Sequence, residues 1–232
     1  MIERVSETGS TSADLAARLR SGDALPEGFW LIADRQSAGR GRQGREWLDA
    51  AGNFMGSTIV RPGFGDPPAS SLALVAGLAV HEAVSPWVTA PRKALLKWPN
   101  DLLIGKAKLA GILLEQVTDT VIVGIGVNLA AAPQLADREA ISLAGLGKAP
   151  DRDTFAESLS QGFARELERW RNFGLEPVVN RWLAAAHPRG TRLSADGVVG
   201  AFAGLTAEGA LQLRLADGSL RTIHAGEVTL SD

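Results

Sequence analysis

FWLIADRQSAGRGRQGREWLDAAGNF, residues 29 to 54, is the stretch that decides which fold this chain can adopt. Its segment GRGRQG, residues 39 to 44, satisfies the G-x-G-x-x-G pattern of dinucleotide-binding folds. Those folds need the glycines between a strand and the start of a helix, because the pyrophosphate sits on the helix N-terminus. Residues 29–34 form an apolar run typical of a buried strand, but residues 45–54 lack a helical apolar period. The stretch therefore argues against a dinucleotide-binding fold.

The same segment is unusually rich in positive charge. Arg40, Arg42 and Arg45 fall within six residues, and Trp47 follows. Glycines leave the backbone free to fold around a ligand, arginines bind anions, and a tryptophan can stack on a flat ring. A solvated surface turn also explains a glycine- and arginine-rich loop. An anion-binding loop and a surface turn therefore both stay open at this point.

Composition narrows the class of protein. The chain has 232 residues, 45% hydrophobic and 22% charged, which is enough for one sizeable domain and a small appendage. Its formal net charge is −2, so no global basic field recruits nucleic acid or an anionic membrane, and any anion site must be local. The absence of cysteine excludes disulfides, thiolate catalysis and cysteine-bound zinc.

The sequence shows neither a signal peptide pattern nor an apolar stretch long enough to span a membrane. The N-terminal residues lack the basic-then-apolar pattern of a signal peptide, and the apolar run at residues 72–80 is too short to span a bilayer. We therefore expect a soluble, cytoplasmic protein.

Apolar periodicity predicts alternating helices and strands. The expected helices are residues 10–20, 71–84, 154–173 and 177–186, and the expected strands are residues 29–34, 53–60, 94–98, 108–117 and 120–129, the last two joined as a hairpin. From His187 onward, short runs are separated by Asp-Gly and Glu-Gly pairs, a pattern typical of a small all-β module. We expect a main domain at residues 1–187 and a second domain at residues 188–232.

KWPNDLLIGKAKLAGILLE, residues 97 to 115, is the second informative stretch. A strand ends in Trp98, and the turn after it would expose the side chains of Asn100 and Asp101. Lys108 then opens the next strand, where alternation places it on the face of Ala110 and Ile112. A hairpin with a polar turn and a solvated lysine is the plain alternative.

The distribution of lysine favours a functional reading of that stretch. Lysine is rare among the 24 basic residues; it occurs at Lys93, Lys97, Lys106, Lys108 and Lys148. Three of these five lie between residues 97 and 108. A chain that otherwise uses arginine keeps lysine here, which suggests that a compact ammonium group is needed.

The strand at residues 120–129 has two unlike faces. Valine and isoleucine alternate with Gly124, Gly126 and Asn128, so one face is nearly bare and carries a single amide. Glycines in a strand let a ligand or another backbone approach, although close helix packing explains them equally well. Ser10, Thr11 and Ser12 are by default a helix cap.

Together these segments resemble biotin protein ligases. GSTS (9–12), QSAGRGRQGREW (36–47), NFMGS (53–57), residues 97–115 and GIGVNL (124–129) match motifs of that family in order and at similar spacing. The resemblance extends from about residue 8 to the C-terminus, whose β module is similar to the family's SH3-like domain. It departs at Ser12, where many members have asparagine, so the contact made by that amide is shortened or lost. The larger repressor members carry a winged helix-turn-helix domain first, for which the residues before Ser10 leave no room.

The resemblance implies an α+β fold: a mixed β-sheet with flanking helices, like that of class II synthetases, plus a small C-terminal SH3-like β-barrel. It also implies ATP-dependent ligation of biotin to a lysine of a biotin carboxyl carrier domain through biotinyl-5'-AMP, with Mg²⁺ accompanying ATP and without DNA-binding repressor function. Pushing the carboxylate onto the α-phosphate brings two anions together, so the protein must supply cations and positioning.

Site residues follow from the resemblance and from this chemistry. Arg40, Arg42, Asp101 and Lys108 are expected to be catalytic. The residues expected to bind biotin are Ser10, Thr11, Ser12, Gln36, Gly39, Arg40, Gly41, Arg42, Lys108 and Gly111, and those expected to bind the nucleotide are Arg42, Trp47, Asn100 and Asn128. Asp101 is the expected metal ligand, or a base for the acceptor amine, or a group that only orients it.

Two other functions stay open from the sequence. A lipoate protein ligase-like enzyme has a related fold and uses the same adenylate chemistry, although the GRGR loop argues against it. A non-enzymatic biotin-binding regulator is weakened by the lack of a DNA-binding domain. Partners would be biotin, ATP and a carrier domain, with no nucleic acid and no membrane. The sequence decides neither between monomer and homodimer nor which carrier protein is used.

Overall fold

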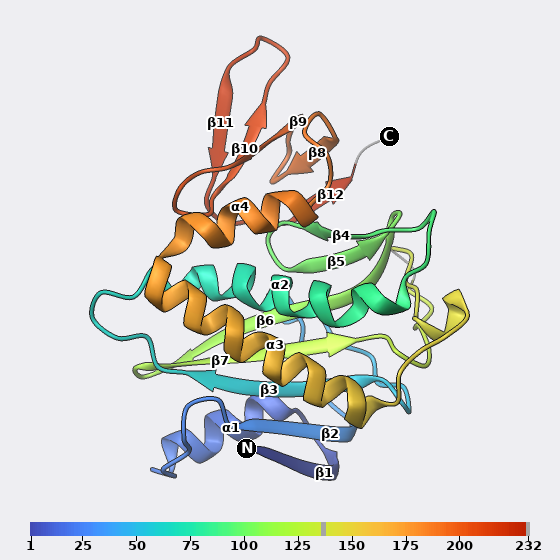
Figure 1. Cartoon of the computed structure of the whole chain (residues 1–232), viewed down its shortest axis with the longest axis vertical. Coiled ribbons are helices and arrows are strands. Elements are labelled where there is room, and N and C mark those ends of the chain that lie inside the picture. The colour runs from blue at the N-terminus through green and yellow to red at the C-terminus, as the bar shows by residue number, and fades with distance from the viewer. Residues whose placement is uncertain (136–137, 231–232) are drawn as a thin grey trace.

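A computed structural model describes residues 1–135 and 138–230 and shows a seven-stranded sheet beside a five-stranded one (Figure 1). The large sheet has the order β1-β2-β3-β7-β6-β5-β4, and the small sheet the order β11-β10-β9-β8-β12. The strands are β1 Ile2–Thr8, β2 Trp30–Gln36, β3 Phe54–Val60, β4 Ala94–Lys97, β5 Asp101–Ile104, β6 Ala107–Val117, β7 Thr120–Val127, β8 Arg192–Ala195, β9 Val198–Leu205, β10 Leu211–Arg214, β11 Leu220–Ile223 and β12 Val228–Leu230. The α-helices are α1 Thr11–Arg20, α2 Leu72–Val84, α3 Arg152–Phe173 and α4 Leu175–Ala185.

The large sheet is mixed, as the resemblance to biotin protein ligases implied. β1 pairs with β2 in parallel, and every other neighbouring pair is antiparallel. The central strands β3 and β7 are buried along their whole length, because both faces of the sheet are covered there. Their sequences are accordingly rich in β-branched residues rather than strictly alternating.

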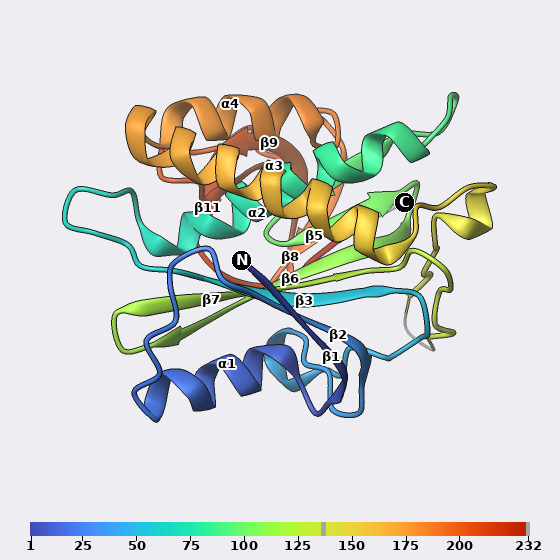
Figure 2. The ribbon, with the colours of Figure 1, turned by 60° about the horizontal axis from the view of Figure 1, so that its bottom comes forward.

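Helices cover the two faces of this sheet unequally. α2, α3 and α4 lie over one face, and α1 lies over the other (Figure 2). The Nε1 of Trp170 in α3 donates a hydrogen bond of 2.8 Å to Oγ of Ser71, at the start of α2, so the indole is both buried and satisfied. The face under α1 is only partly covered by helix, which leaves room for a pocket.

α2 is the most apolar helix. The segment Ala69–Trp87 is long and apolar enough to cross a membrane by length and composition alone, but 61% of it is buried inside the protein. It packs between α3 and the strand β6. Burial in the core therefore explains its apolar sequence.

The five-stranded module is joined directly to the main core. Leu193, Phe202 and Leu213 belong to the same hydrophobic cluster as the residues beneath α2. The Nε1 of Trp98 donates a 3.0 Å hydrogen bond to the carbonyl of Gly209 in the module. β8 begins at Arg192, a few residues after α4 ends, while the division into two domains at residue 187 stays a prediction.

Periodicity predicted the long elements well. All four α-helices and the five predicted strands are confirmed to within a few residues, as is the hairpin between β6 and β7. Two strands were missed. β1 has no buried residue and carries three charges, and β5 has only four residues in a stretch interpreted as a turn.

The face assigned to Lys108 was wrong. The pairing of β5 with β6 shifts register, so that Leu102 faces Ala110 and Leu103 faces Lys108. This irregularity at Leu109 resets the alternation of side chains. Lys108 therefore projects over Gly111, whereas Ile112 points toward Gly77 of α2 on the opposite face.

Phe163 of α3 gives a direct test of the core. Its ring is 1% exposed and lies edge-on to Trp30, with ring centroids 5.7 Å apart. We expect Phe163→Ala to lower the free energy of unfolding by about 3–5 kcal/mol, because it removes buried surface and leaves a cavity. Phe173→Ala, on the same helix but 70% exposed, is the matched control and should change it by less than about 0.5 kcal/mol. Similar denaturation midpoints for the two variants would contradict this packing.

Candidate active site

A pocket lies on the face of the large sheet that carries α1. Its floor is the bare part of β6 and β7, where Gly111, Gly124 and Gly126 line it. A Cβ on Gly126 would stand 2.3 Å from the ring of Trp47, and a Cβ on Gly124 would stand 2.6 Å from Oγ of Ser12. The glycines are therefore needed for close approach to the sheet, as one of the two interpretations of this strand proposed.

One end of the pocket is a buried group of uncharged hydrogen-bonding side chains. Oε1 of Gln36 accepts hydrogen bonds from the backbone N–H of Thr11 (2.7 Å) and from its hydroxyl (3.0 Å). Oγ of Ser57 lies 2.8 Å from the hydroxyl of Thr11 and 2.9 Å from that of Ser12. Hydroxyls both donate and accept, so this end can bind a small polar group with donors and acceptors of its own.

The N-terminus of α1 holds these residues in place. Ser10 is the N-cap, and its hydroxyl accepts a 3.4 Å hydrogen bond from the N–H of Ala13. Ser10 also lines the pocket. The default expectation of a helix cap is thus confirmed, and the same residues form one wall of a cavity.

The other end of the pocket holds a buried carboxylate between two ammonium groups. Nζ of Lys108 lies 2.5 Å from Oδ1 of Asp101, and Nζ of Lys97 lies 2.9 Å from its Oδ2. Burial raises the pKa of Asp101, but the charges of Lys108 and Lys97 oppose this and bring the pKa below its ordinary value. Asp101 is therefore ionised at neutral pH, and one lysine charge remains in excess.

The register shift at Leu109 creates this arrangement. Asp101 faces Gly111 across the β5–β6 pair, and the Lys108 side chain comes back over Gly111, its Nζ 3.0 Å from where a Cβ would be. With regular alternation Lys108 would share the face of Ala110 and point away from the carboxylate.

Residues 39–47 form a closed loop over the pocket. The two ends of the loop are joined by a hydrogen bond of 2.9 Å from the N–H of Trp47 to the carbonyl of Gly39. Within the loop, the N–H of Gly41 donates a hydrogen bond of 2.7 Å to the carbonyl of Arg45. The Trp47 ring lies on the glycine floor, and Nζ of Lys108 is 5.9 Å from its centroid. The segment thus forms part of the pocket wall and is not a detached surface turn.

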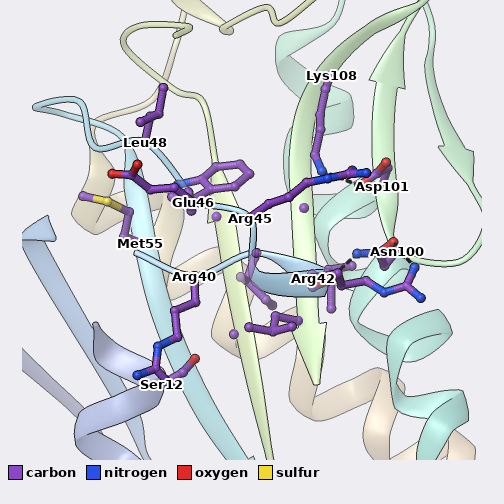
Figure 3. A pocket seen from close by; sticks show the side chains of 18 of the residues that line it. Ser12, Arg40, Arg42, Arg45, Glu46, Leu48, Met55, Asn100, Asp101 and Lys108 are labelled. Atoms are coloured by element: carbon purple, nitrogen blue, oxygen red, sulfur yellow. Dashed lines mark hydrogen bonds and ion pairs between the residues drawn. The ribbon is translucent and has the colours of Figure 1, made fainter. Parts of the chain in front are cut away.

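The two arginines of the loop point in different directions. Arg40 extends toward the end that contains Ser12 (Figure 3), and its Nη1 lies 3.6 Å from Oε1 of Glu115. Nη1 of Arg42 donates hydrogen bonds of 3.2 Å to Oδ1 of Asn100 and to the carbonyl of Gly226 in the C-terminal module. A joint role of both arginines on one carboxylate–phosphate pair stays a prediction.

Three buried polar atoms in the pocket have no hydrogen-bond partner among the residues that the structure describes, and one of them, Oδ1 of Asp101, is still ion-paired with Lys108; the other two have no partner of either kind. These two are Nε1 of Trp47, a donor, and Oδ1 of Asn128, an acceptor. Nδ2 of Asn128 is held by the carbonyls of Lys108 (3.3 Å) and Ile141 (3.2 Å), so the amide is fixed with Oδ1 unused. Buried groups of this kind normally have a partner, which points to a ligand with both a donor and an acceptor.

The structure brings nearly all of the predicted site residues together. The pocket is lined by Ser10, Thr11, Ser12, Gln36, Arg40, Gly41, Arg42, Trp47, Asn100, Asp101, Lys108, Gly111 and Asn128. Gly39 lies where the two ends of the loop meet and does not line the pocket. The catalytic and binding roles assigned to these residues stay predictions.

Sequence reasoning missed other lining residues, chiefly Ser57, Lys97, Arg45, Arg138 and Glu227. Ser57 and Lys97 lie inside motifs that were noticed, and Arg45 was noticed for its charge, so a closer reading could have found all three. The sequence around Glu227 does not indicate its role, since its partner Arg45 lies 182 residues away in the chain.

The donor set does not fit a metal ion bound by the protein alone. Among residues 1–135 and 138–230, no three His, Cys, Asp or Glu side chains cluster as metal ligands. Both oxygens of Asp101 are already engaged by lysines. The metal role of Asp101 stays a prediction, and this arrangement argues against it.

Comparison with known proteins gives two family matches. Residues 5–129 match the biotin/lipoate A/B protein ligase family, and residues 191–231 match the biotin protein ligase C-terminal domain. A biotin–[acetyl-CoA-carboxylase] ligase of Paracoccus denitrificans is 39% identical over 98% of both chains. The bifunctional ligase/repressor BirA of Escherichia coli is 31% identical over 97% of this chain and 72% of its own length.

Solved structures agree with these matches. The biotin protein ligase from Aquifex aeolicus in complex with biotin and ATP superposes with a TM-score of 0.87, 27% identity and 99% coverage of both chains. The Leishmania major ligase in complex with biotinyl-5-AMP gives a TM-score of 0.67 at 27% identity, covering 97% of this chain and 98% of its own.

Because Lys97 and Lys108 lower the pKa of Asp101, removing one of these lysines should change that pKa measurably. Lys97→Gln removes one of the two charges that lower its pKa, so that pKa should rise toward or above its ordinary value. Carboxyl ¹³C chemical shifts of Asp101 followed against pH would measure this. Lys93→Gln, which alters an exposed lysine just before β4, should leave the pKa unchanged. An unchanged or lower pKa in Lys97→Gln would show that Lys97 does not stabilise the carboxylate.

Proposed function

This chain belongs to the biotin/lipoate A/B protein ligase family, and we propose that it ligates biotin to a lysine of a carrier domain through biotinyl-5'-AMP. One observation carries the proposal. A single pocket has buried hydroxyl and amide groups at one end and a cluster of cations at the other, with the Trp47 ring on its floor. Such a pocket matches a ligand with a polar uncharged head, an apolar body and an anionic tail.

The uncharged end discriminates between biotin and lipoate. The ureido ring of biotin has two N–H donors and a carbonyl acceptor, which Thr11, Ser12 and Ser57 can satisfy. A dithiolane ring would leave these buried hydroxyls without a ligand partner, and a site built for hydrogen bonds strongly rejects an analogue that lacks them. The pocket therefore favours biotin.

The cationic end supports the first half-reaction. A carboxylate oxygen of biotin attacks the α-phosphorus of ATP, a new C–O–P bond forms, and the bond to pyrophosphate breaks. Negative charge accumulates on the phosphoryl oxygens as this happens. Lys108 is the group best placed to stabilise it, because its ammonium group is fixed by Asp101 and needs no reorganisation.

Mg²⁺ would accompany ATP and neutralise phosphate charge, and no protein residue is assigned to it. The nucleotide base would meet Trp47 and Asn128. The unused Oδ1 of Asn128 can accept a hydrogen bond from an exocyclic amine, and the Trp47 ring offers a stacking surface.

In the second half-reaction the acceptor amine attacks the acyl carbon and AMP leaves. The amine must first lose a proton. Asp101 holds a proton weakly, since the charges of its two lysines bring its pKa below the ordinary value. Asp101 is therefore a poor base, and because both of its oxygens are engaged by lysines it acts by fixing those lysines, while the proton of the amine passes to solvent.

The partners follow from this chemistry. They are biotin, ATP and a carrier domain of a biotin-dependent carboxylase, and the reaction belongs in the cytoplasm, where ATP is found. Neither a nucleic acid nor a membrane takes part, and both monomer and homodimer are compatible with the proposal.

Radiolabelled biotin, MgATP and a biotin carboxyl carrier domain test the proposal directly. We expect biotin-dependent pyrophosphate release and label on one lysine of the carrier, with lipoate as a poor substitute. Release that lipoate supports equally well would favour the lipoate ligase alternative. Binding of biotin without any pyrophosphate release would favour the non-enzymatic regulator.

Lys108→Ala should slow adenylation by about 100- to 1,000-fold, because the loss of one fixed charge costs about 3–4 kcal/mol in the transition state. Lys108→Arg should not restore the rate, since a planar fork cannot replace a point charge here. Single-turnover pyrophosphate release measures both variants. Near-normal release by Lys108→Ala would remove Lys108 from the mechanism.

The loop at residues 39–52 should act as a lid. Its three arginines repel one another and glycine has the most conformational freedom to lose, so we expect an anionic ligand to order it. Hydrogen exchange of its amides should slow when biotinyl-AMP binds. Arg42→Gly should keep part of the adenylation rate but release the adenylate, which would label bystander proteins. Equal exchange rates with and without ligand, and a variant that labels only the carrier, would argue for a rigid pocket.

A further inference from the structure

Three consecutive residues of the C-terminal module each hold one cation of the pocket. The carbonyl of Gly226 accepts a 3.2 Å hydrogen bond from Arg42, and the carbonyl of Val228 accepts one of 2.8 Å from Nζ of Lys97. Between them, the carboxylate of Glu227 pairs with both terminal nitrogens of Arg45. The three cations come from two separate parts of the main domain, the loop at 39–47 and the end of β4.

The segment 226–228 is itself fixed from behind. Gly226 has a φ of 142°, and a Cβ there would stand 2.2 Å from Oδ2 of Asp196, so only glycine fits. The N–H of Glu227 donates a 3.3 Å hydrogen bond to Oδ1 of Asp196. Val228 pairs with Ala195 of β8. The acceptors are thus held in place before any ligand arrives.

Glu227 is the only side chain of the three that contributes its own charge. Its hydrogen bonds to Arg45 lower its pKa below the ordinary value, and Arg138 and Lys97 contribute further. It is therefore ionised at neutral pH and faces several cations at the mouth of the pocket. Figure 3 shows Arg45 reaching across this mouth toward the Lys108–Asp101 pair.

Stability alone does not account for this ion pair. The side chains of Arg45 and Glu227 are each 39% exposed, and exposed pairs contribute little to folding. Their placement matters more, because Arg45 belongs to a glycine-rich loop whose regular structure is limited to the short 3₁₀ turn Arg42–Gly44. A bidentate arginine–carboxylate pair fixes both the distance and the plane of the guanidinium group.

We propose that Glu227 is a positioning residue for adenylation, which holds Arg45 and with it the loop at 39–47 over the phosphate end of the pocket. The C-terminal module therefore completes the nucleotide side of the site, while the biotin side is built wholly by the main domain. This inference rests on the proposed function, and it predicts that Glu227 affects the use of ATP and not the binding of biotin.

Glu227→Gln tests the inference, since it keeps the size of the side chain and removes its charge. We expect the KM for ATP to rise about two- to fivefold, the upper part of the range that an exposed ion pair spans. The dissociation constant for biotin should stay within about twofold of the wild-type value, because a distant exposed pair contributes little to its binding. Amides of residues 40–46 should exchange faster, and the melting temperature should be unchanged.

Two controls make the result specific. Glu82→Gln removes an exposed ion pair with Arg165 on the opposite face of the sheet and should change none of these quantities. In an Arg45→Gln background, Glu227→Gln should have no further effect on the KM for ATP, because both substitutions remove the same interaction.

The inference is overturned if Glu227→Gln matches the wild type in KM for ATP and in loop exchange. It is also overturned if biotin binding weakens as much as ATP use, or if the effect is undiminished in the Arg45→Gln background. Failure of the proposed function would look different, since the wild-type protein would then show no biotin-dependent pyrophosphate release.

Discussion

The carboxylate of Asp101, held between the ammonium groups of Lys97 and Lys108, is the interaction on which the rest of the site depends. A pocket that brings two anions together needs several cations, and cations crowded into a partly buried space repel one another. Asp101 offsets that repulsion and fixes both lysines, while the carbonyl of Val228 holds Lys97 from the other side. Because the carboxylate is paired with two lysines, it stays ionised although it is buried.

The sheet provides the second constraint. Large side chains fill the face beneath α2 and α3, whereas glycines on β6 and β7 leave the opposite face bare. The main core can therefore be tightly packed while a flat ligand approaches the backbone of the same strands from the other side. α1 supplies hydroxyls at one end of this bare surface, and Lys97, Asp101 and Lys108, on the strands β4, β5 and β6, supply charges at the other. The position of the ligand is thus set by elements that are more than 70 residues apart in the chain.

Much of this arrangement was predictable from the sequence. The long helices and strands have clear apolar periods, and the motifs around Thr11, Arg42, Asp101, Lys108 and Asn128 converge on one pocket as expected. The prediction from alternating side chains failed at Lys108, because one extra residue in β6, Leu109, moves the Lys108 side chain to the other face of the sheet. Nothing in the composition of the stretch indicates this extra residue. The contacts of Glu227 could not be predicted, since they join segments that meet only after the C-terminal module has packed against the main domain.

The central claim is that the pocket is complementary to biotin and AMP joined together, with the lysine pair at the junction. Calorimetric titration with a non-hydrolysable biotinyl-AMP analogue, compared with biotin alone, tests it most directly. The account predicts that the analogue binds at least about 100-fold more tightly than biotin, as expected for a mimic of the reacting state, and that Lys108→Ala loses most of this advantage. An analogue that binds no more tightly than biotin, or an advantage that survives in Lys108→Ala, would contradict it.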